Sequence, residues 1–299
     1  MSRRLPKFLL GFLVPHSLVV LRSELKRKRA MRLARAARVE EQSGDGKLTF
    51  DYEQAVAFLA AQRCDERQVI EGSMPPTSLE FCGRAISRLY AGEPLMGLHV
   101  GNFVGLSLCY FTSLVRSLHP DSRVIAIDPN VPHRGISDPA GEVIRMLCHF
   151  QCQANSLLLT GYTLEKSISN DGLDSTGAYD PVAAFAGEMS CEQQLPALKF
   201  LCSCRFDFCV IDGNHSGEYL EREIAVVEDL LKPNGLLILD DITESWHEIR
   251  SVFEGRVGRG FSRVGTDGQV GILKKEPSAE TNGSTSKGQP GVTRPQSPR

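Results

Sequence analysis

The sequence predicts an α/β protein with a doubly wound, mostly parallel sheet that is covered by helices on both faces. Short apolar runs recur through residues 93–275, and helix-compatible segments lie between most of them. Strands that alternate with helices imply right-handed crossovers and therefore a parallel sheet. Near the end of this region, FSRVGTDGQVGIL is typical of an antiparallel hairpin that turns at Asp267 and Gly268.

Five apolar runs are expected to form the parallel strands, because short runs rich in Val, Ile and Leu are typical of strands buried on both faces. The runs are Leu95–Val100, Arg123–Ile127, Leu157–Thr160, Phe206–Ile211 and Gly235–Leu239. The clearest helix is EYLEREIAVVEDLLK, in which four apolar residues recur on one face: Leu220, Ile224, Val227 and Leu231. Together these elements predict a Rossmann-like sheet with a C-terminal antiparallel hairpin.

Composition divides the 299 residues into four regions. Residues 1–42 are expected to form a basic helical arm, and residues 43–92 a helical cap that GSMPPTS interrupts. Residues 93–275 form the α/β domain. Residues 276–299 are rich in Pro, Gly and Ser without apolar periodicity, so this tail is expected to be disordered.

The charges are distributed unevenly along the chain. Residues 1–40 hold 11 Lys and Arg against 2 Asp and Glu, whereas the other residues hold 23 basic and 34 acidic side chains. A solvated basic helix is the simpler interpretation of the arm, and peripheral contact with an anionic membrane is the alternative. No basic groove with interleaved aromatic residues is visible, so we expect no nucleic-acid partner. The apolar stretch Phe8–Leu21 is shorter than the roughly 20 residues that span a bilayer.

The nine cysteines indicate a reducing environment. Their number is odd, their spacing is irregular, and several lie inside apolar runs, as Cys109 and Cys209 do. Buried reduced thiols are the simplest interpretation, and they favour a cytoplasmic location. A homo-oligomer is left open.

The loop after the first strand, GNFVGLS, is a candidate binding loop for a cofactor. Gly101 and Gly105 permit a tight turn and close approach of the backbone to a ligand, and Asn102 lies between them. Ser107 lies near the start of the next helix, whose free amides can hold a carboxylate. The same glycines could also form a strand–helix turn that binds nothing.

Asp128 is a candidate ribose-binding residue. It ends the second strand, about 23–27 residues after the two glycines. An acidic residue at that place can accept hydrogen bonds from both ribose hydroxyls of a nucleoside cofactor, although a turn or helix cap is the alternative. The glycine loop and Asp128 together favour an adenosine-type cofactor without separating NAD from S-adenosylmethionine.

Polar side chains also follow the fourth and fifth strands. Asp212 comes directly after the fourth strand with His215 three residues later, and Asp240 and Asp241 end the fifth. Ends of neighbouring parallel strands lie about 4.8 Å apart, so the three carboxylates could converge. Converging carboxylates repel unless a proton or cation neutralises them, and hard oxygen ligands suit Mg²⁺, Mn²⁺ or Ca²⁺. His215 is a candidate general base, and a loop histidine bonded to backbone is the alternative.

These motifs together resemble those of class I S-adenosylmethionine-dependent methyltransferases. The resemblance is narrower to the family grouped with macrolide-sugar O-methyltransferases and cephalosporin hydroxylase-like proteins. It covers about residues 70–275 and is most specific in IDGNHSGEYLEREI and LLKPNGLLILDDI. It implies that S-adenosylmethionine binds, and that a hydroxyl of a sugar, glycan or small metabolite is methylated with the help of Mg²⁺ or another divalent cation.

The resemblance also implies roles for individual residues. The loop that holds the methionine part of the cofactor matches Gly101, Gly105 and Ser107, and the ribose-binding acid matches Asp128. The metal ligands match three carboxylates, and His215 and Asp212 match catalytic positions. The three carboxylates are Asp212, Asp240 and Asp241.

The chain departs from this family at several places. His99 stands where an acidic residue usually orients the amino group of the cofactor, Asn214 replaces a second Asp, and Asp241 replaces the Asn of catechol-type enzymes. The segment from Glu165 to Cys204 is long and could form a lid or acceptor pocket. Two alternatives remain: an NAD-type oxidoreductase, which the spacing G-x-x-x-G disfavours, and a non-catalytic binding module, which His99 leaves open.

Overall fold

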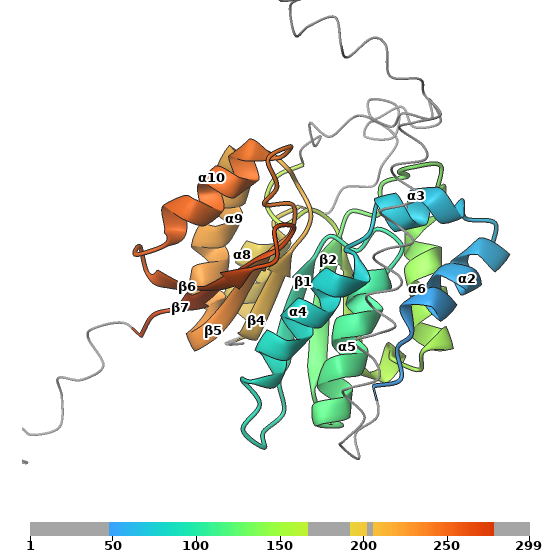
Figure 1. Ribbon diagram of the computed structural model, residues 1–299, viewed down its shortest axis with the longest axis horizontal. Helices are drawn as coiled ribbons and strands as arrows, with labels where there is room; N and C mark the ends of the chain where they lie inside the picture. The colour runs from blue at the N-terminus through green and yellow to red at the C-terminus, as the bar shows by residue number, and fades with distance from the viewer. Residues whose placement is uncertain (1–47, 167–191, 202–205, 278–299) are drawn as a thin grey trace, which may run out of the picture.

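The structure, a computed structural model, describes residues 48–166, 192–201 and 206–277 (Figure 1). Its centre is a seven-stranded sheet with the order β3-β2-β1-β4-β5-β7-β6. The first five strands pair in parallel, and β7 pairs antiparallel with both β5 and β6. The strands are β1 (Met96–Val100), β2 (Arg123–Asp128), β3 (Ser156–Thr160), β4 (Phe206–Ile211), β5 (Leu231–Leu239), β6 (Phe261–Thr266) and β7 (Gly271–Lys275).

All five expected parallel strands and the expected hairpin are confirmed. The hairpin turns where the sequence predicts, since the amide of Asp267 donates to the carbonyl of Val270 across the turn. The main difference is β5, which begins at Leu231, four residues before the expected start. Leu231 follows the preceding helix without a loop and already pairs with Phe206, and a register irregularity separates this pair from the rest of the ladder.

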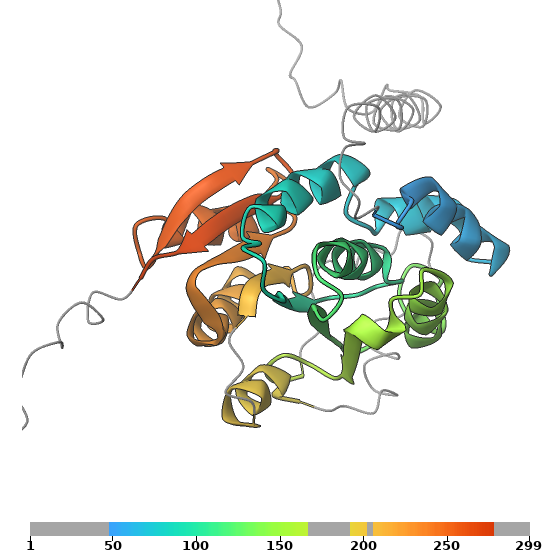
Figure 2. The same ribbon diagram turned by 90° about the horizontal axis from the view of Figure 1, so that it is seen from below.

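Helices cover both faces of the sheet (Figures 1 and 2). Four of the longer helices share one apolar cluster with the inward side chains of the strands: α2 (Tyr52–Ala61), α4 (Pro76–Ser87), α5 (Leu106–Leu118) and α6 (Pro139–His149). Three helices share the cluster on the opposite face: α8 (Gln194–Leu201), α9 (Gly217–Leu230) and α10 (His247–Arg256). Two shorter elements complete the order, α3 (Glu66–Glu71) and η3 (Gln153–Asn155).

The helical cap shares its core with the sheet. Leu59 of α2, Val69 of α3 and Leu79 of α4 lie in the same buried cluster as Val124 and Ala126 of β2. GSMPPTS breaks the helical pattern as expected, and α4 begins inside it, because proline at the first helical position loses no hydrogen bond. The loop between α3 and α4 is thereby held at the carboxyl ends of the strands.

Parts of the predicted organisation lie outside the described residues. The basic arm lies there entirely, the tail does so apart from residues 276–277, and the segment 165–204 is described only for 165–166 and 192–201. Among the helices that the structure describes, none combines the length and the apolar character that a membrane span requires. Cys109 and Cys209 are buried free thiols, as predicted.

Candidate active site

A cavity of about 500 Å³ opens at the carboxyl ends of the parallel strands. Its floor includes Gly101 after β1, Asp128 at the end of β2 and Asp212 after β4. The α3–α4 loop, the segment after β3 and the start of α9 form its walls. This volume falls in the range of roughly 300–1,000 Å³ that small-molecule sites occupy. The cavity therefore lies where the sequence predicts that ligands bind, beyond the carboxyl ends of these strands.

The glycine loop turns as tightly as its sequence predicts. Gly101 has a φ of +83° and Gly105, the N-cap of α5, a φ of +87°, a region that side chains other than glycine rarely adopt. A methyl group on Gly101 would lie 1.8 Å from the carbonyl oxygen of Asp212, so only glycine lets the loops after β1 and β4 cross here. Gly101 lines the cavity, whereas Asn102 and Gly105 lie behind it.

The carboxylate of Asp128 organises the loops around it. One oxygen accepts hydrogen bonds from the backbone amides of Asn102 and Phe103, and the other accepts from the amide of Asn130. The side chain is mostly buried and still lines the cavity. Because Asp128 lines the cavity while it fixes the glycine loop, its carboxylate can also face a hydroxyl of a bound ligand.

Ser107 and His99 form a buried pair behind the glycine loop. The hydroxyl of Ser107 lies 3.1 Å from Nε2 of His99, and neither residue lines the cavity. Burial lowers the pKa of His99 to about 4, with the Asn102 side chain opposing that shift, so His99 is neutral at physiological pH. A neutral imidazole therefore occupies the position where the resemblance predicts an acid, and it pairs with the Ser107 hydroxyl outside the cavity lining.

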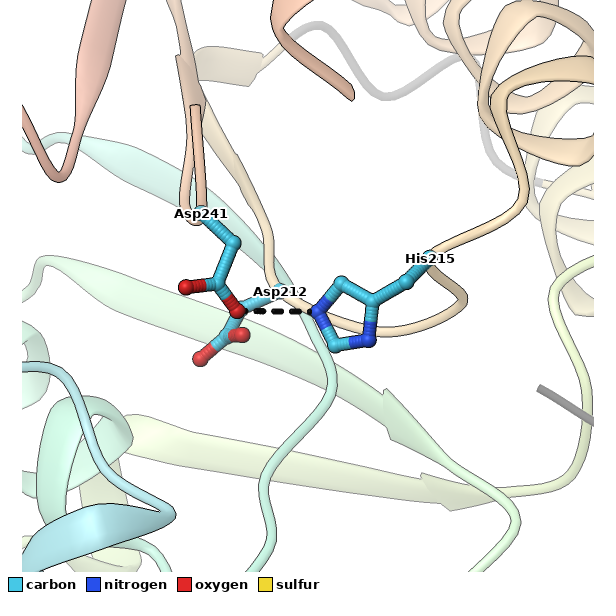
Figure 3. Close-up of side chains that lie close together, drawn as sticks. All are labelled: Asp212, His215 and Asp241. Carbon is cyan, nitrogen blue, oxygen red and sulfur yellow. Dashed lines mark ion pairs between the residues drawn. The ribbon is translucent and has the colours of Figure 1, made fainter. Parts of the chain in front are cut away.

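Three of the predicted functional residues converge at the ends of β4 and β5 (Figure 3). One ligand atom each from Asp212, His215 and Asp241 lies within 4.8 Å of the others. Nε2 of His215 is 3.0 Å from a carboxylate oxygen of Asp241. Asp241 has a φ of +57°, a conformation that Asp tolerates better than most residues, and this turn directs its carboxylate toward the histidine.

Two further residues hold this cluster in place, and the sequence did not reveal either of them. The ring of Trp246 stacks on His215 with centroids 4.4 Å apart and planes 19° apart. Nε2 of Gln269, in the β6–β7 turn, donates to Asp240 at 3.1 Å and to Asp241 at 2.6 Å. Asp240 is not a member of the three-residue cluster, and its Oδ1 accepts from Gln269 and from the amide of Asp241.

The donor set fits a divalent cation. Desolvation, followed by the charges of Asp240 and Asp241, raises the pKa of Asp212 well above its ordinary value. Desolvation and the charge of Asp241 raise the pKa of Asp240 to about 7. A cation would relieve this crowding of carboxylates, and carboxylate oxygens with one imidazole are ordinary ligands for such ions. Asp212 and Asp241 thus offer the carboxylates that could hold a metal, and His215 beside them could serve either as a third ligand or as a base.

Glu223 is a second polar group on the cavity wall that the sequence did not identify as functional. Glu223 of α9 is 1% exposed and lines the cavity. The hydroxyl of Thr163 donates to its Oε1, whereas its Oε2 has no hydrogen-bond partner among the described residues. The signal was present in the sequence, since Glu223 interrupts the apolar stripe that Leu220, Ile224 and Val227 form. This spacing places Glu223 on the helix face that packs against the core.

Burial of Glu223 makes the stability of the protein depend on pH. Desolvation raises the pKa of Glu223 from 4.5 to about 8. The contribution of Glu223 to the free energy of unfolding is fully present below pH 4.5 and is lost as pH rises through about 8. The loss is at most about 1.4 kcal/mol per pH unit. Glu223→Gln keeps the shape without the titration. We expect its advantage in the free energy of unfolding over wild type to grow from pH 5 to pH 8, in urea titrations. A constant difference would contradict this.

The sheet order, the glycine loop and the acidic strand ends around one cavity define the class I methyltransferase fold. Residues 98–242 match the model of a family described as a methyltransferase domain. Over these residues the chain is similar to that family. No curated protein is significantly similar to it in sequence.

Solved structures agree with the fold. The O-methyltransferase TomG from Streptomyces achromogenes, in complex with SAM, superposes with a TM-score of 0.50 at 13% identity, over 79% of this chain and 92% of that one. An O-methyltransferase from Bacillus cereus in complex with SAH gives a TM-score of 0.51 at 15% identity, over 81% and 96% of the two chains. At these identities the likeness shows a shared fold.

Proposed function

We propose that this protein is an S-adenosylmethionine-dependent O-methyltransferase that methylates a hydroxyl of a sugar or small metabolite with the assistance of a divalent metal. One observation carries the proposal: the cluster of Asp212, His215 and Asp241 faces the same cavity as Gly101 and Asp128. A nucleoside cofactor held by Asp128 would thus extend toward a group that can activate an acceptor. An NAD-type oxidoreductase would leave this acidic cluster without a role.

In this proposal, residues at the ends of successive strands bind different parts of the cofactor. Asp128 accepts hydrogen bonds from the ribose hydroxyls, and Gly101, which lines the cavity without a side chain, lets the cofactor lie close to the backbone after β1. Bound S-adenosylmethionine supplies an electrophilic methyl group on its sulfonium sulfur, and positioning is then the main task of the protein. The fixed loops around Asp128 provide that positioning.

His215 takes the proton from the acceptor hydroxyl as its oxygen receives the methyl group. The neighbouring carboxylate of Asp241 holds the imidazole and stabilises its protonated form. Stacking on Trp246 fixes the plane of the ring. A cation held by Asp212 and Asp241 would lower the pKa of the acceptor hydroxyl. The proposed acceptor is a hydroxyl of a sugar or secondary metabolite. We also propose that the basic arm contacts a membrane peripherally and that the protein forms a homo-oligomer.

Calorimetry with S-adenosylhomocysteine tests the cofactor. We expect the wild-type protein to bind it with a dissociation constant in the micromolar range and to bind NAD at least a hundredfold more weakly. Preferential binding of NAD would support the oxidoreductase, and binding of neither compound would support the non-catalytic module. Either result would remove the proposed function.

An acceptor screen tests the reaction. Sugars, catechols and other hydroxyl compounds would be incubated with S-adenosylmethionine labelled in its methyl group, with Mg²⁺ or Mn²⁺ and with a chelator. We expect label to appear on an acceptor oxygen and the rate to fall at least tenfold with the chelator. Equal rates with metal and with chelator would remove the metal from the mechanism but leave methyl transfer intact.

A further inference from the structure

We infer that Glu223 recognises the nucleobase of the cofactor through Oε2, with Thr163 fixing the orientation of its carboxyl group. This inference rests on the proposed S-adenosylmethionine-dependent function. The ligand class that it specifies is a purine with adjacent donor and acceptor groups on one edge, as adenine has at its 6-amino group and N1. Neither the mechanism above nor the acidic cluster uses Glu223.

The position of Glu223 follows from the strand order. The reacting end of the cofactor belongs near β4 and β5, where Asp212 and Asp241 lie, and the ribose belongs at Asp128 on β2. The next strand outward is β3, about 4.8 Å further along. The base, on the far side of the ribose, therefore falls near the segment after β3, where Gly161, Tyr162 and Thr163 line the cavity.

Helix α9 brings Glu223 to this segment. Thr163 donates to Oε1 of Glu223, and the hydroxyl of Tyr219, one turn earlier, lies 3.2 Å from the Thr163 hydroxyl. Tyr219 also donates to the carbonyl of Glu165 and accepts from the amide of Leu164. These contacts fix the carboxyl group of Glu223 rather than leaving it on a mobile side chain.

The remaining oxygen of Glu223 is the group that a ligand would satisfy. Oε2 is buried without a hydrogen-bond partner in the part of the chain that the structure describes, and its residue lines the cavity. A buried polar atom without a partner is costly, and nearly all such atoms in proteins are satisfied by protein, water or ligand. A hydrogen bond to a bound base would remove that cost.

The chemistry of a carboxyl group suits the edge of adenine. A neutral carboxyl donates from Oε2 to an unprotonated ring nitrogen such as N1, and an ionised one accepts from the 6-amino group beside it. Burial favours the neutral form, since it raises the pKa of Glu223 to about 8. Adenine therefore offers a partner in both protonation states.

Titration of S-adenosylhomocysteine into three variants tests the inference. Glu223→Met removes the hydrogen-bonding group at similar size and is expected to weaken binding about tenfold at pH 7. Glu223→Gln keeps a donor for N1 and an acceptor for Thr163, and it is expected to bind within about threefold of wild type. Glu218→Gln changes an exposed glutamate of the same helix and should leave the affinity unchanged.

Thermal unfolding of the ligand-free variants separates recognition from a structural role. Glu223→Met should unfold at or above the wild-type temperature, because an apolar side chain replaces an unsatisfied buried carboxyl. Wild-type affinity in Glu223→Met, equal losses in the Gln and Met variants, or a lost affinity that accompanies lower stability would each overturn the inference. A wild-type protein that binds no S-adenosylhomocysteine would instead refute the proposed function, and the inference would fall with it.

Discussion

Asparagine in place of Asp212 is expected to lower the rate of methyl transfer by about 10²–10⁴-fold, the range that loss of an acid, base or metal-activated step produces. Asp212 lies with His215 and Asp241 in the cluster at the strand ends, and asparagine keeps its shape without its charge. We also expect the metal concentration for half-maximal activity to rise at least tenfold. Initial rates at saturating S-adenosylmethionine, measured across a Mn²⁺ titration, provide both numbers.

The same substitution should not weaken the fold. The pKa of Asp212 is raised, so the wild-type protein loses stability as pH rises and Asp212 ionises in its crowded site. In metal-free urea titrations at pH 8, Asp212→Asn should therefore be as stable as wild type or more so. Asp229→Asn, the same exchange at an exposed position of α9, is the matched control; it should leave the rate unchanged, and loss of its exposed ion pair with Lys199 should cost at most about 1 kcal/mol. Full activity in Asp212→Asn would show that the cluster has no part in the reaction.

The sequence could predict where the functional residues lie along the sheet, because buried parallel strands are legible as short apolar runs. Once the ends of β2, β4 and β5 are known, Asp128, Asp212 and Asp241 must share one edge. The outward extension of β5 to Leu231 was missed, since Pro233 and Asn234 hide its first half from an apolar pattern. This error moves the start of the strand and leaves its functional end in place.

The sequence could not predict which side chains face one another across the site. Gln269 reaches Asp241 from a hairpin 28 residues later, and Thr163 reaches Glu223 across 60 residues. Such partners depend on how helices and turns pack, which local periodicity does not encode. Ser107 illustrates the opposite case, since its place at the start of α5 was predictable but its partner, His99, was not. Its predicted role beside the cofactor stays a prediction.

Alanine in place of Gly101 is expected to destabilise the protein more than any other substitution in the glycine loop. The positive φ alone costs a side-chain-bearing residue about 1–2 kcal/mol. At Gly101 the added methyl group would also lie 1.8 Å from the backbone carbonyl of Asp212, which cannot rotate away as a side chain can. Strain and overpacking together should reduce the free energy of unfolding by more than about 3 kcal/mol.

Gly105→Ala separates these two contributions. Gly105 has nearly the same φ, but its nearest contact, Cα of Val143, is 3.2 Å from the added methyl group, so the conformational cost of about 1–2 kcal/mol should dominate. Urea titrations of both variants measure the difference. If the strain at Gly101 is relieved by moving the loop after β4, Asp212 moves with it, and Gly101→Ala should lose metal affinity as well as stability. Equal destabilisation of the two variants would instead show that the loops after β1 and β4 can separate at no cost in free energy. The predicted effect of Gly101→Ala on the acidic cluster would then be wrong.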